Sequence, residues 1–183
     1  RYLHGLGHRQ VVYLGVRKGS DTHLLRHRGF LDAAEELDMT VDTIWNPGSH
    51  STSESGYRLA RHFFLQPFSH TAVFAASDLM ALGIMQAADE LDIAIPEQLS
   101  LLGFDNIDYA ALPKIRLTTI SQRAEALARS GVRLLTELIQ QDDGLEFTQR
   151  LLTPELIQRD TCCEVCGKDR AGLQTNRCKI SVT

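Results

Sequence analysis

The chain has 183 residues, of which 43% are hydrophobic and 23% are charged, a composition typical of globular proteins and unlike that of disordered or collagen-like chains. Nineteen Lys and Arg against 23 Asp and Glu give a net charge of −4, whereas a domain that binds nucleic acid by itself is usually basic, because it neutralises phosphates. No apolar run approaches the ~20 residues that cross a bilayer. The composition therefore argues against a membrane span and against direct contact of these residues with DNA or RNA.

Short apolar runs alternate along the chain with segments of helical periodicity. Strand-like runs occur at 11–16, 41–45, 71–76 and 99–104, and the first of these is continuously apolar, which is typical of a strand buried on both faces. Apolar residues recur on one helical face at 23–37, 53–64, 79–91 and 124–140. Ser53 and either Ser77 or Asp78 are the expected N-caps of the second and third helices. Shorter extended pieces are expected at 117–120, 147–152 and 155–158.

Strands that alternate with helices predict an α/β fold, in which βαβ units form layers around a parallel sheet. Ligands of such sheets bind beyond the carboxyl ends of the strands. The loops that follow the predicted strands are 17–26, 46–53, 77–78 and 105–109, so we expect a binding site to be built from them.

No set of residues supports catalysis. Gly5-Leu6-Gly7 begins like a dinucleotide-binding fingerprint, but it precedes a strand and lacks the third glycine; Gly7 is better placed to end a helix with a positive φ. His23 and His27 are one helical turn apart, yet no third metal ligand is evident, so solvated histidines beside Arg26 are the favoured interpretation. We expect neither an enzyme nor a bound cofactor.

The two ends of the chain carry separate signals. The sequence opens Arg1-Tyr2-Leu3-His4 without Met or a secretory signal, so we expect a cytoplasmic product that begins further upstream. All four cysteines lie at or after position 162, and the Cys163–Cys166 pair lacks the second spaced pair of a zinc site. We therefore predict no metal, a domain over residues 1–160, and a Cys-containing tail over 161–183 that is disordered or non-native.

Five segments in order resemble LacI/GalR-type bacterial transcription regulators. The segment Leu3–Gly15 is similar to the family's "YLxxxGHRxIxxLG", and the others are Thr71–Gly83 ("TAVFxxNDxMAxG"), Ile95–Ile107 ("VPxDxSxxGFDNI"), Leu117–Gln122 ("LTTIxQ") and Pro154–Arg159 ("PxLIxR"). The resemblance implies the second lobe of a two-lobed, periplasmic-binding-protein-like (type I) domain, truncated at its N-terminus. A helix-turn-helix headpiece and the first lobe would lie upstream, and the helix at 124–140 would return to pack on that first lobe.

The resemblance also implies an effector site and a dimer contact. Arg26 and Asp105 match the family's principal effector-binding residues, and a guanidinium with a carboxylate can orient hydroxyl or N–H groups. Ser77, Gln122 and Thr22 match positions at which the resemblance implies an effector contact less strongly. Ser51 stands where several relatives carry a ring that stacks on the effector, which counts against a purine-type effector.

The expected function is therefore a ligand-responsive regulator, a repressor by resemblance, that binds a sugar or sugar phosphate and forms a homodimer. The dimer contact is expected on the helix at 79–91, where Leu82 and Met85 lie away from the core-facing stripe. Operator DNA would be bound only through the upstream headpiece. Two alternatives are a periplasmic sugar-binding protein of a transporter, which shares the fold, and an α/β enzyme such as a dehydrogenase.

Overall fold

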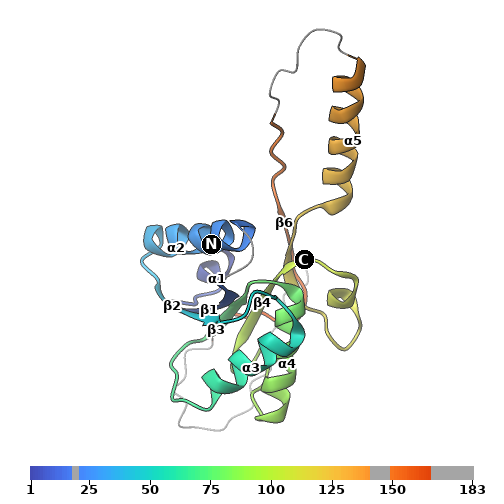
Figure 1. The fold of residues 1–183 in the computed structure, drawn as a ribbon. Helices are drawn as coiled ribbons and strands as arrows, with labels where there is room; N and C mark the ends of the chain where they lie inside the picture. The colour runs from blue at the N-terminus through green and yellow to red at the C-terminus, as the bar shows by residue number, and fades with distance from the viewer. Residues whose placement is uncertain (18–20, 141–148, 166–183) are drawn as a thin grey trace.

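The computed structural model describes residues 1–17, 21–140 and 149–165, and these form a six-stranded sheet flanked by helices (Figure 1). The strand order is β2-β1-β3-β4-β5-β6; the first five strands are parallel and β6 is antiparallel to β5. The strands are β1 Gln10–Val16, β2 Thr40–Asn46, β3 Ala72–Ala75, β4 Ser100–Asp105, β5 Thr118–Ser121 and β6 Glu155–Ile157. The helices are α1 Tyr2–Gly5, α2 Asp21–Glu36, α3 Ser53–Phe64, α4 Asp78–Glu90, α5 Ala124–Gln140 and the 3-10 turn η1 Asp108–Ala111.

The predicted α/β class is confirmed, and the layers follow from the apolar pattern. Helix α2 lies on one face of the sheet, and α3 and α4 lie on the other (Figure 1). Central strands are covered on both faces, so their side chains are apolar without alternation: those of Val11–Leu14 are fully buried. The core therefore consists of the middle of the sheet together with the inner faces of these helices.

Helices α3 and α4 touch through their backbones. A Cβ on Gly83 would lie 1.8 Å from the carbonyl oxygen of Ser53, and a Cβ on Gly56 would lie 2.2 Å from that of Met80. Any larger residue at either position would overlap backbone atoms of the neighbouring helix. These two glycines therefore set the spacing of the helix pair.

The helix ends follow the expected chemistry, with one correction. Ser77 caps α4 as predicted, since its hydroxyl accepts from the Met80 amide. The cap of α3 is Thr52 and not Ser53, because the Thr52 hydroxyl accepts from the Ser55 amide and the Ser55 hydroxyl accepts from the Thr52 amide. Gly7 follows α1 with φ +88°, as expected for a residue that ends a helix.

Two predictions near the C-terminus are wrong. Residues 149–152 form no strand, because β5 offers pairing partners only to residues 155–157; positions 147–148 lie outside the described residues. Residues 161–165 belong to the fold and not to a disordered tail. The Thr161 hydroxyl donates to the Leu101 carbonyl at 2.7 Å, and the Val165 amide donates to the Leu6 carbonyl at 2.9 Å. The rest of the predicted tail, 166–183, with Cys166 and Cys178, lies outside the described residues.

Helix α5 stands away from the sheet (Figure 1). It buries none of its residues, and the large apolar side chains of Leu127, Leu135 and Ile139 are 53, 59 and 75% exposed. This agrees with the expectation that its apolar face packs on no part of the second lobe. Within the described ranges no helix is long and apolar enough to cross a membrane.

Candidate effector site

A cavity of about 300 Å³ opens at the carboxyl edge of the sheet. Its walls come from the first turns of α2 and α4, the end of β4, and residues that follow β2, β3 and β5, as expected for a ligand site of a parallel sheet. The structure brings together all five residues that the sequence predicts for the site. The lining residues are Thr22, His23, Arg26, Ser51, Ser77, Leu79, Asp105 and Gln122.

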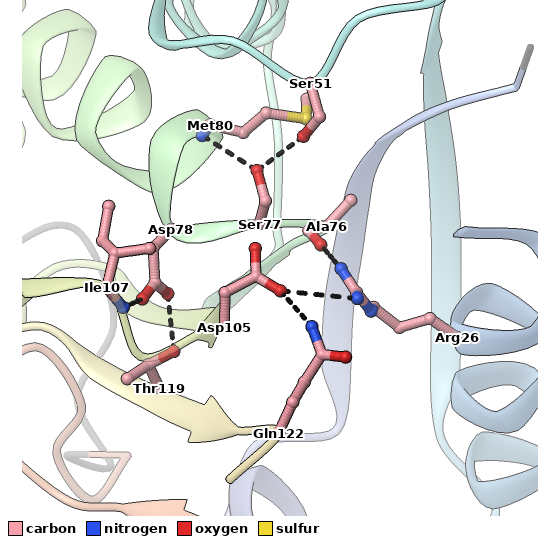
Figure 2. Close-up of polar contacts among 10 residues, drawn as sticks. All are labelled: Arg26, Ser51, Ala76, Ser77, Asp78, Met80, Asp105, Ile107, Thr119 and Gln122. Carbon is pink, nitrogen blue, oxygen red and sulfur yellow. Dashed lines mark hydrogen bonds and ion pairs between the residues drawn. The ribbon is translucent and has the colours of Figure 1, made fainter. Parts of the chain in front are cut away.

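Arg26 is fixed by three different contacts. It projects from α2, and its guanidinium donates to the Ala76 carbonyl at the end of β3 and lies 3.6 Å from the Asp105 carboxylate (Figure 2). Its guanidinium carbon is 3.5 Å from the centre of the Phe104 ring. Only 8% of the side chain is exposed. A planar cation that is stacked and paired in this way presents its N–H groups in one orientation.

Asp105 ends β4 with its carboxylate between Arg26 and Gln122. The Gln122 amide donates to the Asp105 Oδ1 at 2.6 Å (Figure 2). Burial raises the pKa of the Asp105 carboxyl, while the Arg26 charge and the Gln122 hydrogen bond act in the opposite direction. An ionised carboxylate here can accept hydrogen bonds from a ligand and offers none in return.

Three hydroxyl groups also line the cavity. The Ser51 and Ser77 hydroxyls are 2.5 Å apart (Figure 2), and Thr22 adds a third hydroxyl at the start of α2. Ser51 thus lines the cavity at the position where the resemblance led us to look for a stacking ring. Apart from the His23 imidazole, the lining residues carry no ring, and most of them offer hydrogen-bonding groups.

The two histidines of α2 are not the solvated pair that the sequence suggested. His27 packs edge-on against Trp45, with 4.6 Å between ring centres, and its Nε2 is 2.9 Å from the Thr43 hydroxyl. His23 lines the cavity. Burial lowers the pKa of both imidazoles, and the Arg26 charge lowers that of His23 further. No cluster of three His, Cys, Asp or Glu among the described positions could hold a metal ion.

The structural importance of Asp78 is not evident from the sequence. It is the first residue of α4 and is fully buried, and its carboxylate accepts from the Thr119 hydroxyl at 2.5 Å and the Ile107 amide at 2.9 Å. In the sequence this residue resembled an ordinary capping acid. Its position after a buried strand was the available signal, because an Asp there can enter the core only with hydrogen-bond partners.

The predicted dimer residues lie on the outer side of α4. Leu82 is half-buried; Met85 is also half-buried and packs partly on the core. Leu79, one turn before Leu82, is an exposed apolar residue of the same helix.

A polar cavity with one charged pair, at the carboxyl edge of a parallel sheet, defines a small-molecule-binding lobe. The chain belongs to the family of periplasmic binding protein-like domains, whose model matches residues 1–162. This agrees with the resemblance to LacI-type effector-binding domains.

Individual relatives are transcriptional regulators. The HTH-type transcriptional repressor PurR of Yersinia pestis bv. Antiqua (strain Antiqua) is 37% identical over 139 residues, which are 76% of this chain and 41% of that protein. A LacI-family transcriptional regulatory protein from Corynebacterium glutamicum has a TM-score of 0.80 and 28% identity, over 90% of this chain and 62% of that one. A LacI family transcriptional regulator from Enterococcus faecalis V583, with bound ribose, has a TM-score of 0.79 and 27% identity, over 90% and 58%. The chain thus spans about two fifths of the curated relative.

Proposed function

We propose that this chain is the effector-binding and dimerisation region of a LacI-type transcriptional repressor, and that its effector is a sugar or a sugar phosphate. The observation that carries the proposal is the cluster of Arg26, Asp105 and Gln122 on the wall of the cavity. In this function Thr22 and Ser77 contribute further hydroxyl contacts.

The chemistry of the cavity suits a polyhydroxylated ligand. A sugar hydroxyl donates and accepts at once, so it can pair with the donor-only Arg26 and the acceptor-only Asp105 in one ring. A purine would gain much of its affinity from stacking, for which Ser51 offers no surface. The ribose-bound regulator of similar fold supports a pentose as the first compound to test.

In this proposal operator binding would belong to another region of a longer protein, whereas dimerisation would use this chain. Operator DNA would be bound by a helix-turn-helix domain, as the name of the HTH-type relatives suggests. Helix α4 would pair with a second copy through Leu82 and Met85, and α5 would pack its apolar face on the first lobe. The place of action would be the cytoplasm.

A periplasmic sugar-binding protein would use the same fold and cavity. The relatives named above are regulators, and they support a regulator over a transport protein. The same relatives support binding without catalysis.

Calorimetry on the full-length protein tests the proposal, with D-ribose, ribose 5-phosphate and adenosine as ligands. We expect one of the first two to bind and to change the affinity for operator DNA, and residues 1–183 alone to give no sequence-dependent mobility shift. Binding of adenosine alone would contradict the sugar assignment. Ligand binding that leaves operator affinity unchanged would favour the transport alternative.

A further inference from the structure

The turn that carries Asp105 has an uncommon backbone conformation. Asp105 has φ +118° and Asn106 has φ +56°, so two consecutive residues other than glycine lie in the left-handed region. Such strain persists only where the surroundings hold it, and it concentrates at binding sites. Something must therefore hold this turn while Asp105 points into the cavity.

The Asp78 carboxylate holds the turn at Ile107. It accepts the Ile107 amide at 2.9 Å and, with its other oxygen, the Thr119 hydroxyl at 2.5 Å (Figure 2). The sheet leaves room for it through a glycine, since a Cβ on Gly103 would lie 2.3 Å from the Asp78 Oδ1. One buried carboxylate therefore joins the turn, β5 and the start of α4.

Arg159 holds the same turn at Asn106. Its guanidinium donates to the Asn106 side chain at 2.8 Å and to the Leu117 carbonyl at 2.7 Å. The two residues that follow Asp105 in the turn are therefore both held, Asn106 by Arg159 and Ile107 by Asp78.

We propose that Asp78 is a positioning residue for effector binding: its carboxylate fixes the turn that aims Asp105 into the cavity and links that turn to the first residue of α4. The inference rests on the proposed function of Asp105. Asparagine cannot replace Asp78, because it has one acceptor oxygen for two donors and would place its own N–H₂ against one of them. The N-terminus of α4 favours the negative charge.

The experiment uses the full-length protein with D-ribose as the probe. Calorimetry measures the affinity of the wild type, Asp78→Asn, Asp105→Asn, the double variant and the milder Thr119→Val. Ile84→Val is the matched control, since it trims a buried side chain of the same helix without touching the turn. Hydrogen exchange of the Ile107 amide follows the turn directly, with no ligand present.

We expect Asp78→Asn to weaken D-ribose binding about tenfold, Thr119→Val less, and Ile84→Val to leave it unchanged. The Ile107 amide should exchange faster in Asp78→Asn. In the Asp105→Asn background, Asp78→Asn should cause no further loss of affinity, because it acts through Asp105. A merely structural residue would give additive losses instead.

Additive losses in the double variant would overturn the inference, and so would an affinity of Asp78→Asn equal to that of the wild type. In either case, weakened binding by Asp105→Asn would still support the effector site. Thr119→Val provides the same test if Asp78→Asn does not fold. If the wild type binds no sugar and Asp105→Asn changes nothing, the proposed function itself fails, and the role of Asp78 in effector binding fails with it.

Discussion

The guanidinium carbon of Arg26 lies over the ring of Phe104, 3.5 Å from its centre, and Phe104 precedes the ion-pair partner Asp105 in β4. One strand thus supplies both the surface that orients the cation and the charge that balances it. A cation stacked and desolvated in this way interacts more strongly than an exposed one. The arrangement requires a planar cation, which has direct consequences for substitutions.

Arg26→Lys should abolish most effector binding although it keeps the charge. An ammonium group cannot bridge the Ala76 carbonyl and Asp105 while stacking on Phe104, because it lacks the planar fork. We expect a loss of about tenfold or more in effector affinity by calorimetry. Operator affinity without effector should stay at the wild-type level; unchanged effector affinity would contradict the site.

Asp105→Asn should weaken effector binding without unfolding the domain. The amide keeps the shape but replaces an acceptor-only group and leaves the largely buried Arg26 without its counter-charge. Losses of this kind are on the order of 2–5 kcal/mol, or ~30-fold and more. The variant should bind operator and fail to respond to effector. Glu155→Gln, an exposed change on β6, is the control and should respond normally.

The free energy of unfolding should fall as the pH drops below 6.5. His8 is buried between the Thr71 hydroxyl and the Cys163 carbonyl, and burial lowers its pKa from the ordinary 6.5. The unfolded chain then binds a proton that the folded chain does not, so acid favours unfolding, by at most about 1.4 kcal/mol per pH unit for one group.

Denaturant titrations of the wild type and His8→Gln between pH 8 and about 5 check this pH dependence. His23 and His27 also have lowered pKa values and contribute in the same direction. The free energy of unfolding of His8→Gln should therefore still fall with decreasing pH, but with a shallower slope than that of the wild type. An equal slope in both proteins would contradict the assignment to His8.

Gly83→Ala should destabilise the fold, since its Cβ would fall 1.8 Å from the Ser53 carbonyl oxygen. Overpacking of this kind costs about 1–3 kcal/mol or more, because two helix backbones must separate. Gly29→Ala in α2 is the matched control: its Cβ would meet nothing within 4 Å, so a gain of up to about 1 kcal/mol is expected. Urea unfolding of both variants gives the comparison.

Leu82→Asp in the full-length protein should give a folded monomer. The charge would face a partner copy across α4 and would have to be desolvated there without a counter-ion. Sedimentation measures the mass, and Leu25→Asp on the exposed face of α2 is the control that should remain a dimer. A dimer of unchanged affinity in Leu82→Asp would exclude this face.

Local signals in the sequence predicted most of the fold. The apolar run of β1 and the periodicity of α5 give their positions to within one residue, because both depend on neighbours in the chain. The cavity followed from the rule for parallel sheets, and its five predicted residues lie along its wall. The predicted cap of α3, Ser53, was one position away from the observed cap, Thr52, since both residues and Ser51 carry hydroxyls that can cap a helix.

The features that sequence analysis missed depend on distant partners. Asp78 meets Thr119 and Ile107, which are 41 and 29 positions away, and Thr161 meets Leu101 across 60 positions. No local pattern encodes such pairs. The buried acid therefore resembled a cap, and residues 161–165 resembled a tail.

The backbone contact between α3 and α4 has a mechanical consequence. With Gly56 and Gly83 at the crossing, no layer of side chains separates the two helices, so there is nothing soft to deform between them. We therefore expect the two helices to move as one rigid body, so that a displacement of Asp78, the first residue of α4, would also move α3.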